Sequence, residues 1–213
     1  MSILELIKKR RSIRTFQDLR VEEEKLQNIL EAALWAPCSG NLQPWKFIVV
    51  KDHKKKEEIV AAAFNQEWLI GSPVIIIVCG ETEKVKKYYG IRGEHLYVIQ
   101  DCAASIQNIL LEAESEGLAS CWVGAFDEDK LKRSFDIPDK ARPQAIIAIG
   151  YSGEKIPTPA KKDLRSAVFF EKFGEREIKR QELLPIKDSL SFAKSKIKEK
   201  AEKIKQKLVQ KQS

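Results

Sequence analysis

The chain has 213 residues, 43% of them hydrophobic and 32% charged, which is the composition of a folded, water-soluble protein with its own core. No apolar run approaches the roughly 20 residues that a bilayer-spanning helix needs, and no apolar stretch typical of a secretory signal follows the N-terminus. The cysteines form no CxxC pair, so we expect a cytoplasmic protein with four reduced thiols: Cys38, Cys79, Cys102 and Cys121.

The net charge of +7 is concentrated at the C-terminal end of the chain. Residues 175–213 carry 12 Lys and Arg against 6 Asp and Glu, so residues 1–174 are nearly neutral. This argues against a nucleic-acid-binding surface spread over the whole protein. We predict a folded domain over 1–174 and a basic helical extension over 175–213. Its apolar stripe from Leu190 to Leu208 suits packing on a partner subunit or a solvated arm better than attachment to a membrane or nucleic acid.

The periodicity of apolar residues predicts the main helices and strands. Helices are expected over 2–9, 21–35, 54–64 and about 93–116, with a shorter one capped by Asp127. Strands are expected over 45–50, 74–79, 119–123 and 144–151. The run 74–79 is apolar almost throughout, which is typical of a central strand covered on both faces. This pattern indicates an α/β or α+β protein with helices packed on a sheet.

The segment Arg-Arg-Ser-Ile-Arg-Thr-Phe at residues 10–16 carries the first candidate site. Arg10, Ser12 and Arg14 alternate, so an extended backbone turns them to the same side. Two guanidiniums and a hydroxyl suit a phosphate or a delocalised anion, although a basic helix end on the surface is the alternative interpretation. The loop 37–45, Pro-Cys-Ser-Gly-Asn-Leu-Gln-Pro-Trp, adds small polar residues one helix later. Together the two segments fit a phosphate-bearing cofactor.

Several common site motifs do not occur in the chain. GxGxxG, the P-loop motif, HExxH and GxSxG are absent, which disfavours the usual dinucleotide fold, NTPases, zincins and α/β-hydrolases. His95 has no second histidine or carboxylate at a ligand spacing, so we expect a surface or partly buried histidine and no metal site.

These motifs, in this order, resemble the nitroreductase family of FMN-dependent NAD(P)H oxidoreductases over roughly residues 3–173. The resemblance rests on segments 10–16 and 37–45, the corner Phe64-Asn65, the stretch 101–124, and Ile149-Gly150-Tyr151 before a basic Lys161-Lys162. It implies an α+β sandwich with a central, mostly antiparallel sheet flanked by helices. It also implies an intertwined homodimer with two FMN sites across the interface.

The resemblance implies a role for each matching residue. Arg14 would lie near the pyrimidine edge of the flavin and stabilise its reduced form, with no side-chain acid or base assigned. The other subunit would contribute the loop that contains Cys38, where serine is usual, so a hydroxyl contact is lost. Trp68 stands where some members carry lysine, which leaves Arg14 more of the electrostatic role. The implied cofactor-binding residues are Arg10, Arg11, Ser12, Arg14, Pro37, Cys38, Ser39, Asn41, Asn65, Val123, Gly124, and the phosphate clamp Lys161 and Lys162, with Arg165 as a possible substitute.

The implied activity is transfer of a hydride from NADH or NADPH, by a ping-pong mechanism, to nitroaromatic, quinone or flavin-type acceptors. Residues 83–95, with Tyr88, Tyr89 and Arg92, would form either a lid over the flavin or ordinary surface. Two alternatives stay open at this point. One is an FMN enzyme of a neighbouring branch, either a reductive dehalogenase or a flavin-fragmenting enzyme. The other is a non-catalytic flavin-binding protein with a basic interaction tail.

Overall fold

The computed structural model describes residues 2–176, so most of the predicted basic extension lies outside the described residues. The chain divides into two units, the first ending at Thr158 and the second beginning at Pro159. Within the described residues, no helix is both long and apolar enough to cross a membrane. The helices are α1 (Ile3–Lys9), α2 (Glu23–Leu34), α3 (His53–Ala62), α4 (Thr82–Arg92), α5 (Val98–Ser115), α6 (Glu128–Ser134) and, in the second unit, α7 (Leu164–Ala167).

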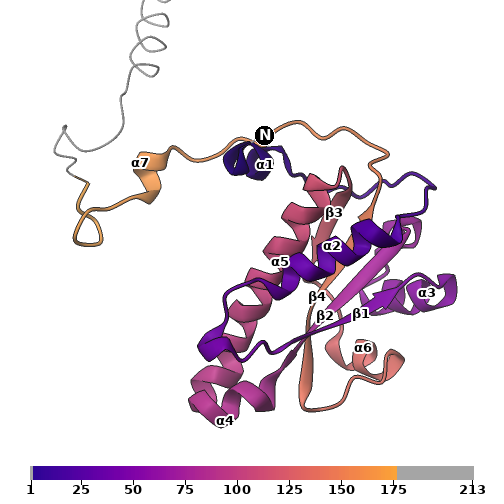
Figure 1. The fold of residues 1–213 in the computed structure, drawn as a ribbon, viewed down its shortest axis with the longest axis horizontal. Helices are drawn as coiled ribbons and strands as arrows, with labels where there is room; N and C mark the ends of the chain where they lie inside the picture. Colours follow the sequence, from indigo (N-terminus) through magenta and orange to yellow (C-terminus); the bar gives the residue numbers. More distant parts are fainter. Residues whose placement is uncertain (1, 177–213) are drawn as a thin grey trace, which may run out of the picture. The chain divides into compact units, whose positions relative to one another are not determined.

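The first unit is built on a four-stranded antiparallel sheet with the order β1-β2-β4-β3 (Figure 1). Its strands are β1 (Trp45–Val50), β2 (Val74–Glu81), β3 (Ala119–Val123) and β4 (Ala141–Gly150). The register pairs Trp45 with Gly80, Val74 with Ile149, and Ala119 with Gly150. The predicted α+β class with an antiparallel sheet is confirmed.

Helices cover both faces of this sheet, and each face has its own core. On one face, α2 and α5 pack on alternate residues of the central strands, such as Ile76 and Ile147. On the other face, α3 and α6 cover the intervening residues, such as Ile77 and Ile146. All four isoleucines are fully buried. This double cover explains why β2 reads as a continuous apolar run, as predicted.

Strand β4 begins at Ala141, three residues before the predicted start, and so contains Pro143. Proline lacks an amide N–H and is normally excluded from central strands. Here Pro143 pairs with Cys79 at a break in the register between Val78 and Cys79. The bulge accommodates the missing donor, so the strand can start before the residue at which the apolar pattern predicts it to begin.

The predicted helix over 93–116 is interrupted, and a further helix precedes it. Residues Gly93–Tyr97 form a π-helical turn between α4 and α5. Gly90 has φ +60°, and a Cβ atom at Gly93 would lie 2.7 Å from the carbonyl oxygen of Val85. These two glycines therefore allow a tight bend that separates α4 from α5. The segment 83–95, predicted as either a lid or ordinary surface, is thus mostly helical.

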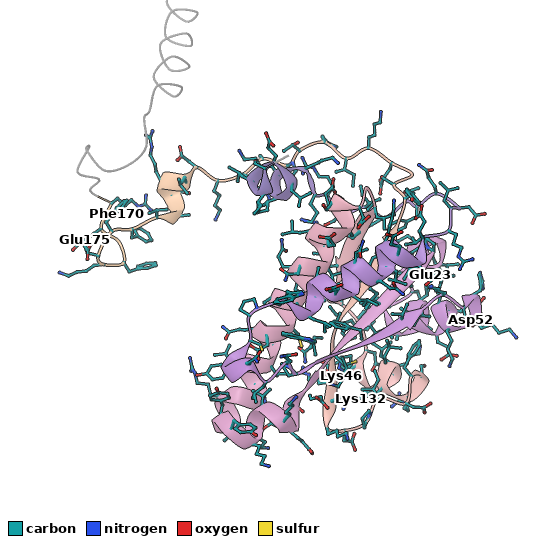
Figure 2. The ribbon with its side chains drawn as sticks, viewed as in Figure 1. Glu23, Lys46, Asp52, Lys132, Phe170 and Glu175 are labelled. Atoms are coloured by element: carbon teal, nitrogen blue, oxygen red, sulfur yellow. The ribbon has the colours of Figure 1, made fainter. Side chains whose placement is uncertain are left out.

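Helix α3 begins at a capping residue that can be tested directly. Asp52 is labelled at the start of α3 in Figure 2, and its carboxylate accepts a hydrogen bond of 3.0 Å from the amide of Lys55. We expect Asp52→Ala to lower the free energy of unfolding by about 0.5–2 kcal/mol, because an amide of the first turn loses its acceptor. Urea denaturation measures this change. Asp52→Asn is the matched control and should retain most of the stability; equal stability of the two variants would contradict the capping role.

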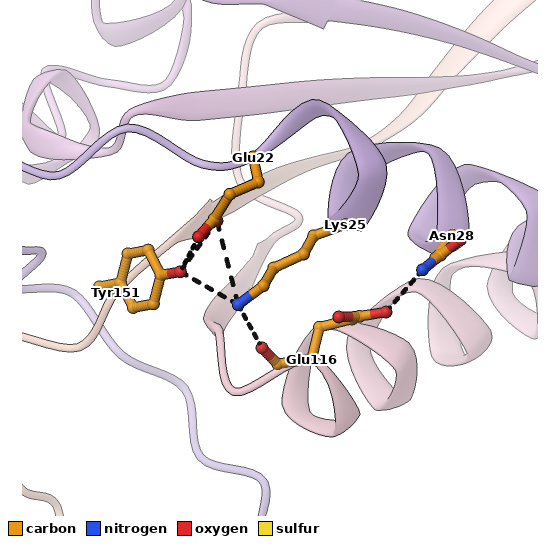
Figure 3. Close-up of polar contacts among 5 residues, drawn as sticks. All are labelled: Glu22, Lys25, Asn28, Glu116 and Tyr151. Atoms are coloured by element: carbon orange, nitrogen blue, oxygen red, sulfur yellow. Dashed lines mark hydrogen bonds and ion pairs between the residues drawn. The ribbon is translucent and has the colours of Figure 1, made fainter.

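A polar network ties the start of α2 to the end of α5 and to the residue after β4 (Figure 3). The ammonium of Lys25 donates to the main-chain oxygen of Glu116 (2.9 Å) and to the hydroxyl of Tyr151 (3.0 Å). That hydroxyl donates to Glu22 (2.8 Å), and Asn28 donates to the Glu116 carboxylate (2.8 Å). The bond to Tyr151 raises the pKa of Lys25, so the ammonium stays charged while it caps the end of α5.

Candidate cofactor site

The segment 10–16 lies extended beside the edge strand β3. Ser12 forms a parallel bridge to Ser120, and the amide of Ile13 donates to the Ser120 carbonyl at 3.1 Å. Ile13 is buried, whereas its neighbours Ser12 and Arg14 are exposed. The burial of Ile13 therefore turns the alternate side chains outward, as the alternating pattern predicts.

Glu154 holds the main chain of this segment in place. One of its carboxylate oxygens accepts hydrogen bonds from the amides of Arg14 (2.6 Å) and Thr15 (2.9 Å). The Thr15 carbonyl in turn accepts from the amide of Gly153 at 2.8 Å. The two amide donors lower the pKa of Glu154. The carboxylate is therefore charged at neutral pH, and the position of Arg14 depends on that charge.

Protonation of Glu154 is expected to loosen the segment in acid. Because its folded-state pKa lies below the ordinary value of 4.5, its contribution is present above that value and is lost as pH falls through the lowered one. We expect Glu154→Gln to remove this part of the acid sensitivity and to lower stability at neutral pH. Thermal melting across pH 3–7 measures both effects. Parallel melting-temperature profiles for the two proteins would contradict the assignment.

The guanidiniums of Arg10 and Arg14 remain available for a ligand. Among residues 2–176, neither guanidinium donates a hydrogen bond. Both lie close enough to Cys121 to act on its pKa: burial raises that pKa, and the two positive charges oppose the rise. The guanidinium of Arg14 lies over the ring of Trp68, with Cζ 5.9 Å from the ring centroid. Two guanidiniums without a hydrogen-bond partner in residues 2–176 therefore lie near the same thiol of strand β3.

Arg11 differs from its two neighbours. Its Nη1 atom donates to the main-chain oxygens of Lys8 (2.6 Å), Lys9 (3.0 Å) and Arg10 (2.8 Å), and Nη2 donates to the hydroxyl of Thr158. This guanidinium therefore caps the carboxyl end of α1. Its Nε atom is buried without an acceptor among the described residues. A direct ligand role for Arg11 stays a prediction, since most of its donors are used within the chain.

The corner after α3 forms the next part of the site. Phe64 and Asn65 are consecutive non-glycine residues in the left-handed region, with φ of +54° and +58°. Such strained pairs often lie at functional sites. Asn65 is exposed, and its side-chain carboxamide makes no hydrogen bond within the described part of the chain. Gln66 donates to the carbonyls of Ala63 (3.1 Å) and Ala125 (3.3 Å), which joins the corner to the loop after β3.

The loop after β3 follows Val123 and begins at Gly124, two further residues predicted to bind the cofactor. Val123 is buried and Gly124 is exposed, so the main chain reaches the surface at Gly124. We use the name arginine face for the set of exposed or half-exposed groups along this edge of the sheet: Arg10, Ser12, Arg14, Asn65 and Gly124.

The predicted loop 37–45 is held by a buried carboxylate on α5. The amide and hydroxyl of Ser39 both donate to Oδ1 of Asp101 at 3.0 Å, and Oδ2 is buried without a partner in residues 2–176. The amide of Gln43 donates to the sulfur of Cys38 at 3.3 Å, so the thiol helps to close the loop. Asn41 is exposed in the left-handed conformation, with φ +55°. This arrangement presents Asn41 to solvent in a fixed loop.

Within residues 2–176, no hydrogen bond or ion pair joins this loop to the arginine face. The loop binds Asp101 in the first turn of α5, whereas α1 contacts the last turn through an ion pair between Lys9 and Glu114 (3.0 Å). Those two α5 positions are separated by about 20 Å at 1.5 Å per residue. Figure 1 shows α1 beside the end of α5 that leads into β3, and α4 beside the opposite end. The contacts that anchor the loop and the start of segment 10–16 therefore lie near opposite ends of α5.

Comparison with known proteins identifies the family. The sequence profile described as the nitroreductase family matches residues 7–66 and 60–151. The chain belongs to the nitroreductase family. A relative from Methanothermobacter thermautotrophicus, with the provisional name NADH dehydrogenase/NAD(P)H nitroreductase, is 38% identical over 77% of this chain and 83% of its own length. The resemblance inferred from the motifs is confirmed.

Solved structures of nitroreductase-family proteins share the fold. A family protein from Clostridium difficile 630 has 32% identity and a TM-score of 0.71, covering 81% of this chain and 99% of its own. An FMN-dependent nitroreductase from Clostridium difficile R20291 has 32% identity and a TM-score of 0.70, covering 80% and 99%. The predicted nitroreductase-like sandwich is thereby confirmed.

Three basic residues assigned from the nitroreductase resemblance lie in the second unit. Lys161 and Lys162 precede α7, and Arg165 lies within it. Their approach to a phosphate stays a prediction. His95 is 66% exposed, as expected for a surface histidine. Within the described residues, no cluster of three His, Cys, Asp or Glu side chains is arranged to hold a metal ion.

The sequence motifs do not reveal two carboxylates that hold the candidate site in place. Asp101 is the only charged residue between Glu94 and Glu112, in an otherwise apolar or neutral helix, and that isolation was a usable signal. Glu154 lies in an ordinary polar turn after β4, and no local pattern distinguishes it. Its role follows only from the folding of residues 14 and 154 onto one edge.

Proposed function

We propose that this protein is an FMN-dependent oxidoreductase that takes a hydride from NADH or NADPH. Nitroaromatic, quinone or flavin-type compounds would be the acceptors, reduced in a second half-reaction of ping-pong type. The observation that carries the proposal is the arginine face, whose two guanidiniums have no hydrogen-bond partner among residues 2–176. Family membership and a relative named FMN reductase (NADPH), from Bacillus subtilis and 28% identical, support it.

The donors along the arginine face fit FMN. A phosphate requires clustered cationic donors, which Arg10 supplies together with the hydroxyl of Ser12. The edge of a flavin carries carbonyl and amide groups, which an exposed carboxamide such as that of Asn65 can pair. Within residues 2–176, Glu154 is the carboxylate that interacts with Arg14, and it is engaged with main-chain amides. The face therefore offers several hydrogen-bond donors, and the carboxylate of Glu154 is already bonded to main-chain amides.

Bound FMN would supply the two-electron chemistry, accepting a hydride and passing it to the second substrate. The protein's task is to hold the cofactor and to stabilise charge. Arg14 would place a fixed positive charge at the pyrimidine edge, where negative charge accumulates on reduction, and Asn65 would orient that edge. Gly124 has no side chain, so the main chain after Val123 leaves room for a substrate to stack.

The complete site would need a second copy of the chain. Each copy would contribute its arginine face to one site and its 37–45 loop to the other, which would join two segments whose anchors on α5 lie about 20 Å apart. Apolar surface suited to such a contact is present: Trp35 is 80% exposed and borders a groove of about 990 Å³ between α2 and β1. The first helix also exposes three apolar side chains, namely Ile3, Leu4 and Ile7.

A visible absorption spectrum followed by anaerobic addition of NADH or NADPH tests the proposal. We expect flavin bands in the purified protein, bleaching on addition of the nicotinamide, and recovery of the bands when a quinone or nitroaromatic acceptor is added. A colourless protein that cannot be reconstituted with FMN would overturn the proposal. Bands that persist with both nicotinamides would favour a non-catalytic flavin-binding protein instead.

A further inference from the structure

Trp68 lies against Arg14 and has no role in the function proposed above. It follows the Phe64-Asn65 corner in the short 3₁₀ helix Glu67–Gly71. Its ring is stacked on that of Phe16, with centroids 6.5 Å apart and an angle of 26° between the planes. The Arg14 guanidinium lies over the same indole, 5.9 Å from its centroid. Phe16 and Arg14 come from the same extended segment, so Trp68 contacts that segment at two points.

The contact uses one part of the guanidinium and leaves the rest available. An aromatic ring attracts a cation through its face, within about 6 Å of the centroid. A cation–π contact of this kind uses none of the N–H donors, and within residues 2–176 no hydrogen bond is made by the Arg14 guanidinium. An ion pair would use one or two of these donors. Trp68 can therefore restrict Arg14 without competing with an anion for its hydrogen bonds.

The main chain of Arg14 is restrained independently. Its amide donates to Glu154 at 2.6 Å, and the next residue on its N-terminal side, Ile13, is anchored to Ser120. The side chain, in contrast, has no hydrogen-bond partner among residues 2–176. The contact with the indole therefore restricts the rotamers of the guanidinium, and this restriction lowers the entropy lost when an anion binds.

We propose that Trp68 is a positioning residue: its indole holds the Arg14 guanidinium through a cation–π contact and so keeps the N–H donors of Arg14 available to the reducible ring of the cofactor. This proposal rests on the FMN function proposed above. A positioned cation stabilises the reduced, more negative cofactor over the oxidised one, so it raises the midpoint potential of the bound flavin. Loss of the aromatic face would leave the charge present but unrestrained.

The test measures the midpoint potential of the FMN-loaded protein in four variants: Trp68→Phe, Trp68→Leu, Arg14→Ala and the double variant Arg14→Ala/Trp68→Leu. We expect Trp68→Leu to weaken binding of reduced relative to oxidised FMN about tenfold, which corresponds to a fall of about 30 mV for a two-electron couple. Trp68→Phe, which keeps an aromatic face, should stay close to the original protein. In the Arg14→Ala background, Trp68→Leu should have no further effect.

Each outcome has a distinct meaning. An equal fall in potential for Trp68→Leu with and without Arg14 would show that Trp68 acts through general packing, and would overturn the proposal. A fall with Arg14→Ala but none with Trp68→Leu would also overturn it, while leaving the proposed FMN function intact. Failure of the original protein to hold FMN would instead refute the function itself. Thermal melting of all four variants separates a change in potential from a loss of folding.

Discussion

Replacing Arg14 with alanine is expected to lower kcat/KM for NAD(P)H oxidation by roughly 10- to 100-fold while most of the FMN stays bound. A hydrogen bond to a charged group contributes about 1.5–3 kcal/mol, and each 1.4 kcal/mol is a factor of ten in rate. The substitution should slow reduction of the flavin more than it weakens FMN binding, because the charge that Arg14 would stabilise develops only when the cofactor is reduced. Anaerobic stopped-flow bleaching measures the rate, and the visible spectrum measures occupancy.

Two other arginines provide the comparison. Arg10→Ala should show the opposite pattern, with weaker FMN binding, because a guanidinium on the phosphate contributes equally to both redox states. Arg20→Ala is the neutral control, since its exposed guanidinium pairs only with Glu23 at 3.1 Å within the described chain. Full turnover in an Arg14→Ala protein with FMN bound would remove Arg14 from the proposed mechanism.

Two inactive variants are expected to restore activity when they are combined in one dimer. The first carries Arg10→Ala and Arg14→Ala, which disable the arginine face, and the second carries Ser39→Ala and Asn41→Ala, which disable the loop. If each site takes its face from one chain and its loop from the other, a mixed dimer has one doubly defective site and one intact site. It should therefore show about half the activity of the original dimer.

Co-expression with two different affinity tags isolates the mixed dimers for this measurement. Dimers that carry both tags on the same variant are the matched control and should remain inactive. If face and loop belonged to the same chain, every site in the mixed dimer would carry one defect. Activity no higher than the mean of the two parents would then be found, and the shared-site proposal would fail.

Much of the first unit could be predicted because burial imposes strong patterns on the sequence. The runs 45–50 and 119–123 match β1 and β3, since the sheet requires apolar residues there. The start of β4 was missed because Pro143 is tolerated only through a bulge that belongs to the neighbouring strand. Helix α4 was missed because only Val85 is buried in it, so it has almost no apolar periodicity.

The candidate site was predicted less completely, and the limits are physical. Alternation placed Ser12 and Arg14 on one side, because Ile13 between them is buried. The alternation did not show that the Arg11 side chain turns back onto α1. The three carbonyl oxygens that accept its hydrogen bonds come together only when the helix has formed. Contacts between residues 14 and 154, and between 39 and 101, depend on the tertiary fold and leave little trace in local sequence.

The separation of the two half-sites along α5 links cofactor loss to dilution. If each FMN is bound by two chains, the cofactor stabilises the dimer. By linkage, formation of the dimer then strengthens FMN binding to the same extent. Added FMN should lower the concentration at which the subunits dissociate, and dilution below that concentration should release the flavin from both sites together. Flavin retention in this protein would then report its quaternary structure, so a yellow colour that fades on dilution would be a sign of subunit separation rather than of unfolding.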